Sequence, residues 1–158
     1  MNTRAPVYVA APYGDPDPQV RDLNADRAEL IARLAAREGL APLVVHSMIH
    51  RGVLGDDSDP AQRAAGIGVS LSLLAVIRAS VHGQLWVLLR DDGERTDGVL
   101  KEIRLWERGT GRAAARRKVT RIGTWDDYAQ AFRAVGLGRQ WEQSAKLGAA
   151  LRRGVVCE

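Results

Sequence analysis

The chain has 158 residues and a formal charge of +4, which suits one soluble domain with a single core. No apolar stretch reaches the length that a membrane span needs, and Pro12 and Gly14 interrupt the apolar N-terminal run where a signal peptide would continue. The single cysteine, Cys157, excludes an intrachain disulfide, so we expect a cytoplasmic protein.

The positive charge is concentrated between residues 104 and 121. Its seven bases are Arg104, Arg108, Arg112, Arg116, Arg117, Lys118 and Arg121. A solvated helix face and loop explains this stretch better than a nucleic-acid patch, because aromatic residues make up only 5% of the chain and do not alternate with the bases.

Hydrophobic periodicity and turn residues predict alternating strands and helices. In the first half of the chain we expect a strand at 7–11, a helix from Val20 to about Glu38, a strand at 41–45 and a loop at 46–63. A helix at 66–81, buried almost all round, and a strand at 84–89 follow. Glu102 opens the next helix, which is followed by a strand at 119–125, a helix starting near Thr124 or Asp126, and a last helix at 139–153. This order predicts a three-layer α/β fold of the Rossmann-like or flavodoxin-like kind, with a parallel sheet of four to five strands between helices. No linker or repeat interrupts it, so residues 1–158 form one predicted domain.

The segment after the third predicted strand carries the most distinctive spacing, Thr96-x-Gly98-x-x-x-Glu102. A hydroxyl and free amides at the start of a helix bind phosphates or sugar hydroxyls, and a glycine lets a ligand approach the backbone. Glu102 would face such a ligand, and a carboxylate beside a sugar C1 can attack it. A helix N-terminal glutamate with no chemical role explains the spacing equally well.

Two other segments follow strands and lead to the same predicted sheet edge. In the first, Tyr13 is either a ligand-contacting residue or a partly buried aromatic cap. In the second, His46 and His50 invite a metal interpretation, but no HExxH pattern is present and glycines interrupt the loop, so we predict no metal site. Asp59 before Pro60 has the pattern of a helix N-cap. Arg63 is expected to pair with Asp56 or Asp57 or to contact a ligand phosphate.

A series of short motifs spans residues 6–109: Ala11-Pro12-Tyr13-Gly14, Asn24, Val45-His46, the loop Leu54 to Arg63, Gly66-Ile67 with Leu73-Leu74, Leu85-Trp86-Val87, and Thr96, Gly98, Glu102 and Ile103. Their order and spacing resemble the nucleoside 2-deoxyribosyltransferase-like superfamily, in particular its bacterial and phage branches. The resemblance implies cleavage or transfer at the N-glycosidic bond of a nucleoside or nucleoside 5′-monophosphate.

By this resemblance Glu102 is the nucleophile and Tyr13 orients it. Asp57 and Asp59 are candidate acids. The implied substrate-binding residues are Pro12, Gly14, Asn24, His46, Arg63, Thr96, Asp97 and Gly98. The resemblance also implies a homo-oligomer, a dimer or larger, and no cofactor; we expect neither a membrane nor a nucleic acid as partner.

One departure from the family pattern concerns the leaving base. Characterised transferases of this superfamily carry an aspartate on the helix before the third strand, whereas residues 66–84 contain no Asp or Glu. Ser70, Ser72 and His82 are the protic side chains there, and Asp97 is a further candidate acid. A non-catalytic module that binds or senses nucleotides, in a phage or defence system, is therefore the alternative hypothesis.

Overall fold

The computed structural model describes residues 4–50, 59–108 and 119–154, without the side chains of residues 46, 49 and 50. Its elements, in chain order, are β1 (Pro6–Ala10), α1 (Pro18–Arg37), β2 (Ala41–Leu43), α2 (Val45–His50), α3 (Pro60–Ala79), β3 (Gln84–Leu88), α4 (Asp97–Glu107), β4 (Arg121–Gly123), the 3-10 turn η1 (Asp126–Tyr128), α6 (Ala129–Ala134) and α7 (Gly138–Arg152).

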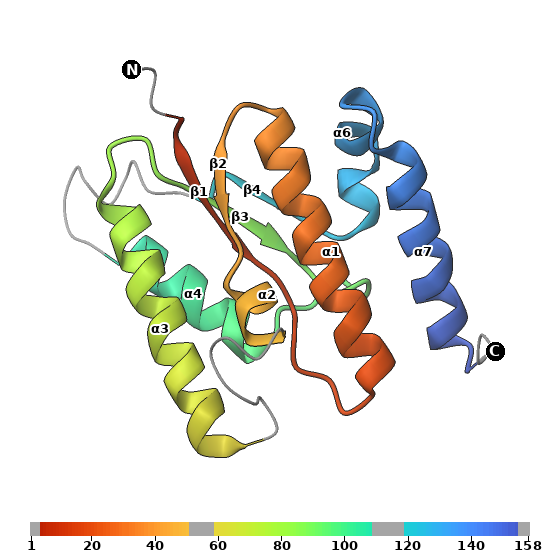
Figure 1. Ribbon diagram of the computed structural model, residues 1–158, viewed down its shortest axis with the longest axis horizontal. Coiled ribbons are helices and arrows are strands. Elements are labelled where there is room, and N and C mark those ends of the chain that lie inside the picture. Colours follow the sequence, from red (N-terminus) through yellow and green to blue (C-terminus); the bar gives the residue numbers. More distant parts are fainter. Residues whose placement is uncertain (1–3, 51–58, 109–118, 155–158) are drawn as a thin grey trace.

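The four described strands form one parallel sheet in the order β2-β1-β3-β4. Helices α3 and α4 cover one face of the sheet, and α1, α6 and α7 cover the other (Figure 1). This arrangement confirms the predicted three-layer α/β fold. Four strands match the lower end of the predicted number.

Alternation along the strands divides the core into two halves. In β1, Val7 and Val9 pack beneath α1 and α6, whereas Tyr8 and Ala10 pack beneath α3 and α4. β3 alternates in the same way, with Trp86 on the α1 side. The central strand β1 therefore sends its one tyrosine into the layer between the sheet and α3.

Helix starts follow the local capping chemistry. Asp17 caps α1 by accepting a hydrogen bond from the Gln19 amide at 2.8 Å, with Pro18 in the first turn, so α1 begins two residues before the predicted Val20. Asp59 caps α3 in the same way, accepting from the Ala61 amide at 2.8 Å, which confirms the predicted N-cap.

Two predictions about residues 41–81 are wrong. The strand ends at Leu43, the last residue in register with β1, and Val45 begins the short helix α2 where a strand end and a loop were predicted. Helix α3 buries only one face, formed by Gly66, Ser70, Leu74 and Ile77, because it covers the sheet and no described helix or strand lies outside it (Figure 1). By length and composition α3 could also cross a membrane, and it is the one such helix among the described residues. This differs from our expectation that no apolar stretch reaches that length, although core helices of soluble proteins pass the same test.

Candidate active site

A cluster of three polar side chains lies buried between the sheet and helices α3 and α4. Tyr8 comes from β1, Ser70 from the middle of α3 and Glu102 from α4. The Tyr8 hydroxyl donates a hydrogen bond of 2.5 Å to Glu102 Oε1, and the Ser70 hydroxyl donates one of 2.9 Å to the same oxygen. The Tyr8 and Ser70 hydroxyls also contact each other. Three elements far apart in sequence are thus joined at one carboxylate oxygen.

The second oxygen of Glu102 is different. Glu102 is only 4% exposed, and its Oε2 has no hydrogen-bond partner among the residues that the structure describes. A buried, unpartnered carboxylate oxygen is costly, and native proteins keep such groups mainly where they serve a function. The two hydroxyls therefore hold Oε1 in place, whereas Oε2 is buried without a hydrogen-bond partner among the described residues.

Burial also sets the charge state of this cluster. It raises the pKa of Glu102 to about 7, because removal from water disfavours the carboxylate; the hydrogen bonds from Tyr8 and Ser70 act in the opposite direction. Burial, and then the nearby Glu102 charge, raise the pKa of Tyr8 well above its ordinary value, so that phenol remains a donor. A glutamate that ionises near neutral pH, held by two neutral donors, is suited to act as a nucleophile or a base.

Glu102 lies deeper than its position in the sequence indicates. Helix α4 begins at Asp97, so Glu102 is in its second turn and not in its first, and it meets β1 at Tyr8, two residues before the strand's last residue Ala10. The helix begins early because Thr96 is its N-cap, accepting a hydrogen bond from the Val99 amide at 3.4 Å. The prediction that Glu102 opens the helix just beyond the sheet edge is therefore wrong.

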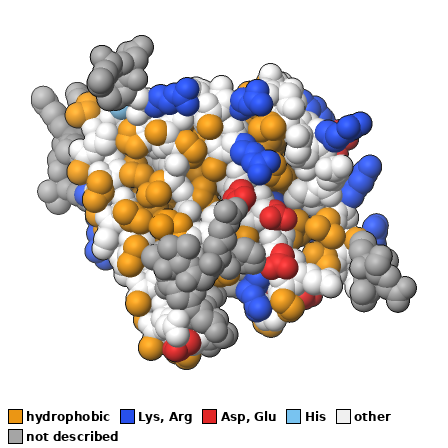
Figure 2. Space-filling model, viewed as in Figure 1, with side chains coloured by type: hydrophobic (Ala, Val, Ile, Leu, Met, Phe, Trp, Pro, Cys, Tyr) orange, Lys and Arg blue, Asp and Glu red, His pale blue; other side chains and the backbone are white. Residues whose placement is uncertain are grey.

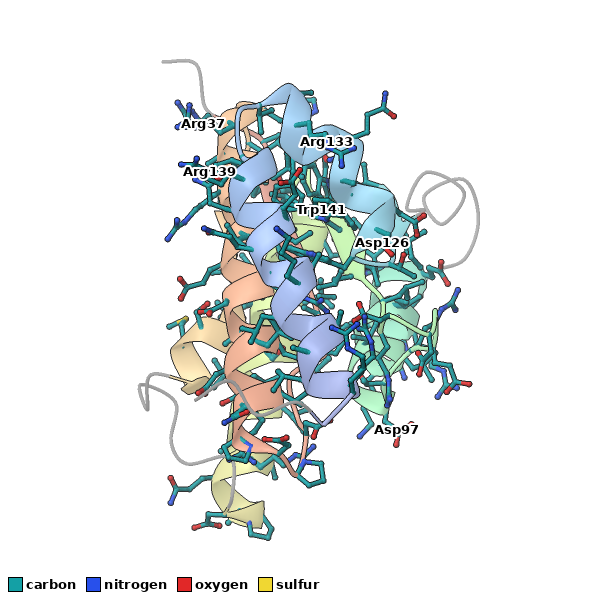
Figure 3. All side chains as sticks on the ribbon, turned by 90° about the vertical axis from the view of Figure 1, so that its right-hand side faces the viewer. Arg37, Asp97, Asp126, Arg133, Arg139 and Trp141 are labelled. Atoms are coloured by element: carbon teal, nitrogen blue, oxygen red, sulfur yellow. The ribbon has the colours of Figure 1, made fainter. Side chains whose placement is uncertain are left out.

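The other predicted residues of this segment surround the start of α4. Asp97 is exposed and its side chain points away from the molecule (Figure 3). Gly98 is also exposed, and among the described atoms a Cβ built on it would meet the Thr96 hydroxyl oxygen alone, at 3.9 Å. The backbone of Gly98 is thus open to a ligand, while the Thr96 hydroxyl is already engaged as a cap.

The loop after β1 meets the start of α3. The Asn24 amide donates a hydrogen bond of 3.5 Å to the Tyr13 carbonyl, which ties α1 to this loop. The Arg63 guanidinium lies over Gly14, where an added Cβ would stand 3.0 Å from its Nη2. Gly14 and Arg63, two of the predicted substrate-binding residues, are thus brought together, and Pro12 is buried.

Two predicted roles stay predictions. Among the described contacts the tyrosine hydroxyl that holds Glu102 belongs to Tyr8, and the role of the half-buried Tyr13 in orienting Glu102 is not tested by them. Asp59 caps α3, the N-cap that the sequence predicted, and its role as an acid is likewise untested. Asp57 and the side chain of His46 lie outside the described residues.

The three protic side chains on or near α3 differ in whether they contact Glu102. Ser70 meets Glu102, whereas the exposed Ser72 donates to the Gly68 carbonyl at 2.9 Å and His82 is exposed beyond the end of the helix. Tyr8 was not among the predicted site residues. The alternation of side chains along the first strand could have indicated it, because alternation places Tyr8 on the opposite face of the sheet from Val7 and Val9. That pattern does not reveal that Glu102 packs against the face that carries Tyr8.

A second polar cluster fixes the segment that leads into α4. Arg27 of α1 is buried and donates to Asp91, just after β3, at 2.9 Å, and Asp91 also pairs with Arg152 of α7. The Arg27 guanidinium lies 5.0 Å from the centre of the Trp125 ring. Burial, followed by the charge of Arg152, lowers the pKa of Arg27 to about 10. This cluster holds the β3–α4 segment against α1 and α7.

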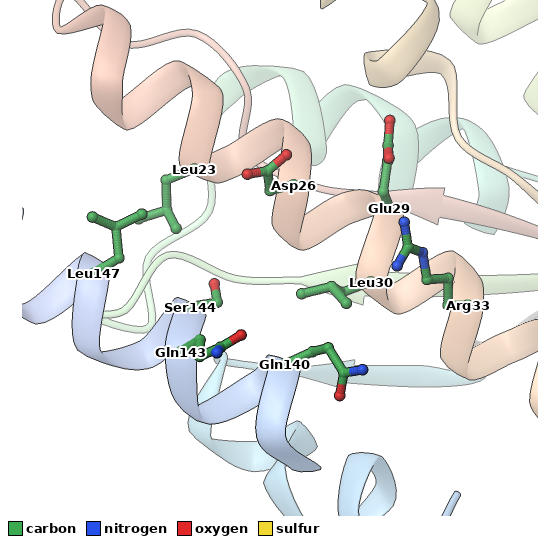
Figure 4. Close-up of a pocket in the computed structure, with 9 residues that line it drawn as sticks. All are labelled: Leu23, Asp26, Glu29, Leu30, Arg33, Gln140, Gln143, Ser144 and Leu147. Atoms are coloured by element: carbon green, nitrogen blue, oxygen red, sulfur yellow. The ribbon is translucent and has the colours of Figure 1, made fainter. Parts of the chain in front are cut away.

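The remaining cavities and possible metal-binding side chains do not involve the predicted site residues. A groove of about 310 Å³ between α1 and α7 is lined by residues that include Leu23, Asp26 and Ser144, none of them predicted site residues (Figure 4). Within the described ranges no group of three or more His, Cys, Asp or Glu side chains could hold a metal ion.

Comparison with known proteins identifies a family. The family described as a domain of unknown function, DUF7768, matches residues 5–113, more than two thirds of the chain. The chain belongs to the DUF7768 family. The match includes Tyr8, Ser70 and Glu102, whereas α6 and α7 of this DUF7768 protein lie beyond it. No curated protein and no solved structure matches the chain.

Proposed function

We propose that this protein hydrolyses or transfers at the N-glycosidic bond of a nucleoside or nucleoside 5′-monophosphate, with Glu102 as the nucleophile. The observation that carries the proposal is the buried Glu102 carboxylate, whose Oε1 is held by two hydroxyls while Oε2 has no partner among the described residues. The resemblance to the nucleoside 2-deoxyribosyltransferase-like superfamily supplies the substrate class.

The chemistry proceeds in two steps. Glu102 Oε2 attacks C1′ of the sugar, a C1′–O bond forms, and the C1′–N bond breaks with its electron pair leaving on the base. Water, or the nitrogen of a second base, then attacks C1′ and the C1′–Oε2 bond breaks with its electron pair returning to the Glu102 carboxylate. The proton that the attacking group loses goes back to the acid that protonated the leaving base. Tyr8 and Ser70 keep Oε1 fixed in both steps, so they position the nucleophile.

The carboxylate must be ionised to attack. Since burial raises the pKa of Glu102 to about 7, we expect base release to increase as pH rises through about 7. The leaving base takes up a proton in the first step. Of the candidate acids, Asp59 caps α3 and Asp97 points away from the molecule. Asp57 lies outside the described residues and stays a candidate acid from the sequence alone.

A binding or sensing module is the second candidate, and one observation favours it. On α3 the side chain that meets Glu102 is the Ser70 hydroxyl, and no carboxylate lies on that helix after Asp59 to protonate a leaving base. A site of this kind would hold a nucleotide at Gly98 and Glu102 without turnover.

One experiment separates the two functions. The protein is incubated with a panel of ribo- and deoxyribonucleosides and their 5′-monophosphates, and free base is measured by chromatography. The variant is Glu102→Gln, and the matched control is Glu107→Gln, an exposed glutamate on the same helix. Base release that is lost in E102Q and retained in E107Q supports the enzyme.

The opposite outcomes are equally definite. Thermal stabilisation by a nucleotide without base release supports the sensor, since a ligand that binds only the folded state raises its stability. Base release at the wild-type rate from E102Q contradicts the role of Glu102 as nucleophile. A mass increase of one sugar on the wild-type protein, absent from E102Q, would identify the covalent intermediate directly.

A further inference from the structure

A closed turn connects strand β3 to the start of helix α4, and we call its residues, Arg90–Glu94, the β3–α4 turn. The Arg90 amide donates to the Glu94 carbonyl at 3.1 Å, and the Gly93 amide donates to the Arg90 carbonyl at 2.9 Å. Gly93 has a φ of 82°, in the left-handed region that favours glycine. One residue separates the turn from Thr96, the N-cap of α4, so a shift of the turn moves the start of that helix.

Asp91 attaches this turn to the rest of the molecule. Among the described residues it is the one member of the β3–α4 turn whose side chain bonds to another element. Its Oδ1 accepts a hydrogen bond of 2.9 Å from the buried Arg27 of α1, and its Oδ2 pairs with Arg152 of α7. The Arg27 side chain is 7% exposed, whereas that of Arg152 is 56% exposed. The attachment therefore has a buried half at α1 and an exposed half at α7.

Helix α7 packs closely over this attachment. Ser144, Gly148 and Arg152 lie four residues apart, so they share one side of the helix. The Ser144 hydroxyl, which points toward α1 in Figure 4, accepts a hydrogen bond of 3.4 Å from Arg27 Nε. A Cβ added at Gly148 would stand 2.5 Å from Arg27 Nη2, so glycine allows this close approach. Packing of this side of α7 on α1 therefore brings Arg152 to Asp91.

The exposed half joins two segments of opposite charge. The residues from Asp91 to Glu94 include three acids, whereas α7 has three bases and one acid. Figure 2 shows Lys and Arg side chains mostly toward α1 and α7 on the face that it presents. Arg152 is the base in the last turn of α7, where the helix dipole favours a cation. Exposed ion pairs contribute little to the stability of a fold, so this pair can open without unfolding of the chain.

We propose that Asp91 is a positioning residue for the candidate active site and that helix α7 strengthens its hold through Arg152. The β3–α4 turn leads into Thr96 and the exposed backbone of Gly98, which is open to a ligand. The family match ends at residue 113, so it includes Asp91 but not Arg152. Helix α7, beyond the match, thus acts on the ligand-binding end of α4. The effect on substrate rests on the proposed function.

The nucleophile is held independently of this attachment. Tyr8 of β1 and Ser70 of α3 fix Glu102 Oε1, and neither bonds to Asp91 or to Arg152. Opening of the Arg152–Asp91 pair therefore loosens the start of α4 and leaves the reacting carboxylate in place. In kinetic terms KM rises while kcat stays the same, because binding is weakened and the chemical step is not.

The test compares full-length variants at position 152. In Arg152→Gln, NMR should find that the amides of Arg90, Gly93 and Glu94 exchange with deuterium about threefold faster than in the wild type. The KM for base release from the nucleoside 5′-monophosphates of the panel above should rise about threefold with kcat unchanged. Arg152→Lys keeps the positive charge and should restore the wild-type values. The matched control is Arg153→Gln, at the next residue, which is also exposed.

Two further comparisons isolate the contact with Asp91. Asp91→Asn removes the negative charge, so adding Arg152→Gln to it should accelerate the exchange of these amides no further. The ratio of KM in Arg152→Gln to KM in the wild type should fall toward one in about 1 M NaCl, because salt screens the exposed ion pair. If Asp91→Asn fails to fold, the salt series on the Arg152 variants tests the same contact.

Wild-type exchange rates in Arg152→Gln, or equal acceleration in Arg153→Gln, would overturn the proposal. A fall in kcat at unchanged KM would also contradict it, because the ion pair would then act on Glu102. If a nucleotide binds without base release, its dissociation constant takes the place of KM. If the wild type neither releases base nor binds any nucleotide of the panel, the proposed function fails, and the amide exchange alone decides whether Arg152 holds the β3–α4 turn.

Discussion

Replacing Glu102 by glutamine should change stability in a way that depends on pH. The carboxyl of Glu102 ionises at about 7 in the folded protein, against an ordinary value of 4.5. Between these values the folded state holds a proton that the unfolded chain has lost, so the wild type loses stability as pH rises through this window. Glutamine does not titrate, and its amide keeps an oxygen that can accept from Tyr8 and Ser70.

The size of the effect follows from the pKa. A rise from 4.5 to about 7 corresponds to about 3 kcal/mol, at 1.36 kcal/mol per pKa unit. The free energy of unfolding of E102Q minus that of the wild type should therefore increase by about 3 kcal/mol between about pH 4 and pH 8.5. Any fixed cost of burying the new amide group cancels in this comparison across pH. For a chain of this size the change corresponds to roughly 6–12 °C in Tm.

The assay is urea unfolding followed by circular dichroism at intervals across this pH range, after a check that two probes give the same transition. Glu107→Gln, on the exposed end of the same helix, corrects for the lost negative charge. If the free energy of unfolding of E102Q minus that of the wild type stays constant across pH, then burial does not disfavour the charged form of Glu102. That result would refute the raised pKa of Glu102.

Three further changes probe the surroundings of the site. Tyr8→Phe removes a hydrogen bond that lowers the pKa of Glu102, so carbon-detected NMR should find that the Glu102 carboxyl titrates at higher pH; an unchanged titration would contradict the bond. Gly98→Ala has open space around its new methyl group, so urea unfolding should show a gain of about 0.5 kcal/mol, while nucleotide binding weakens if the ligand approaches there. Arg27→Met breaks the ion pair with Asp91 and the contact with Trp125 and should lower the free energy of unfolding by about 2 kcal/mol; no loss would show that the buried cluster contributes nothing.

Local patterns in the chain were sufficient for the architecture. Apolar strand runs, helical periodicity and the Asp59–Pro60 start signal act over a few residues, and they predicted the parallel α/β fold and the cap of α3. They were less reliable at element boundaries. Leu43 ends its strand because the register with β1 ends there, and a run of apolar residues does not contain that information.

The candidate site depended on contacts between distant segments. The spacing Thr96-x-Gly98-x-x-x-Glu102 singled out the glutamate and placed Gly98 at an open helix start, both visible in the sequence. Its partners Tyr8 and Ser70 lie 94 and 32 residues away in the chain, and only the packing of α3 and α4 on β1 brings them to one carboxylate oxygen. Helix α3 likewise has the composition of a buried helix, but whether another layer covers it depends on the tertiary arrangement. Sequence patterns report the next few neighbours of a residue, whereas burial and pKa are set by whatever the completed fold places around it.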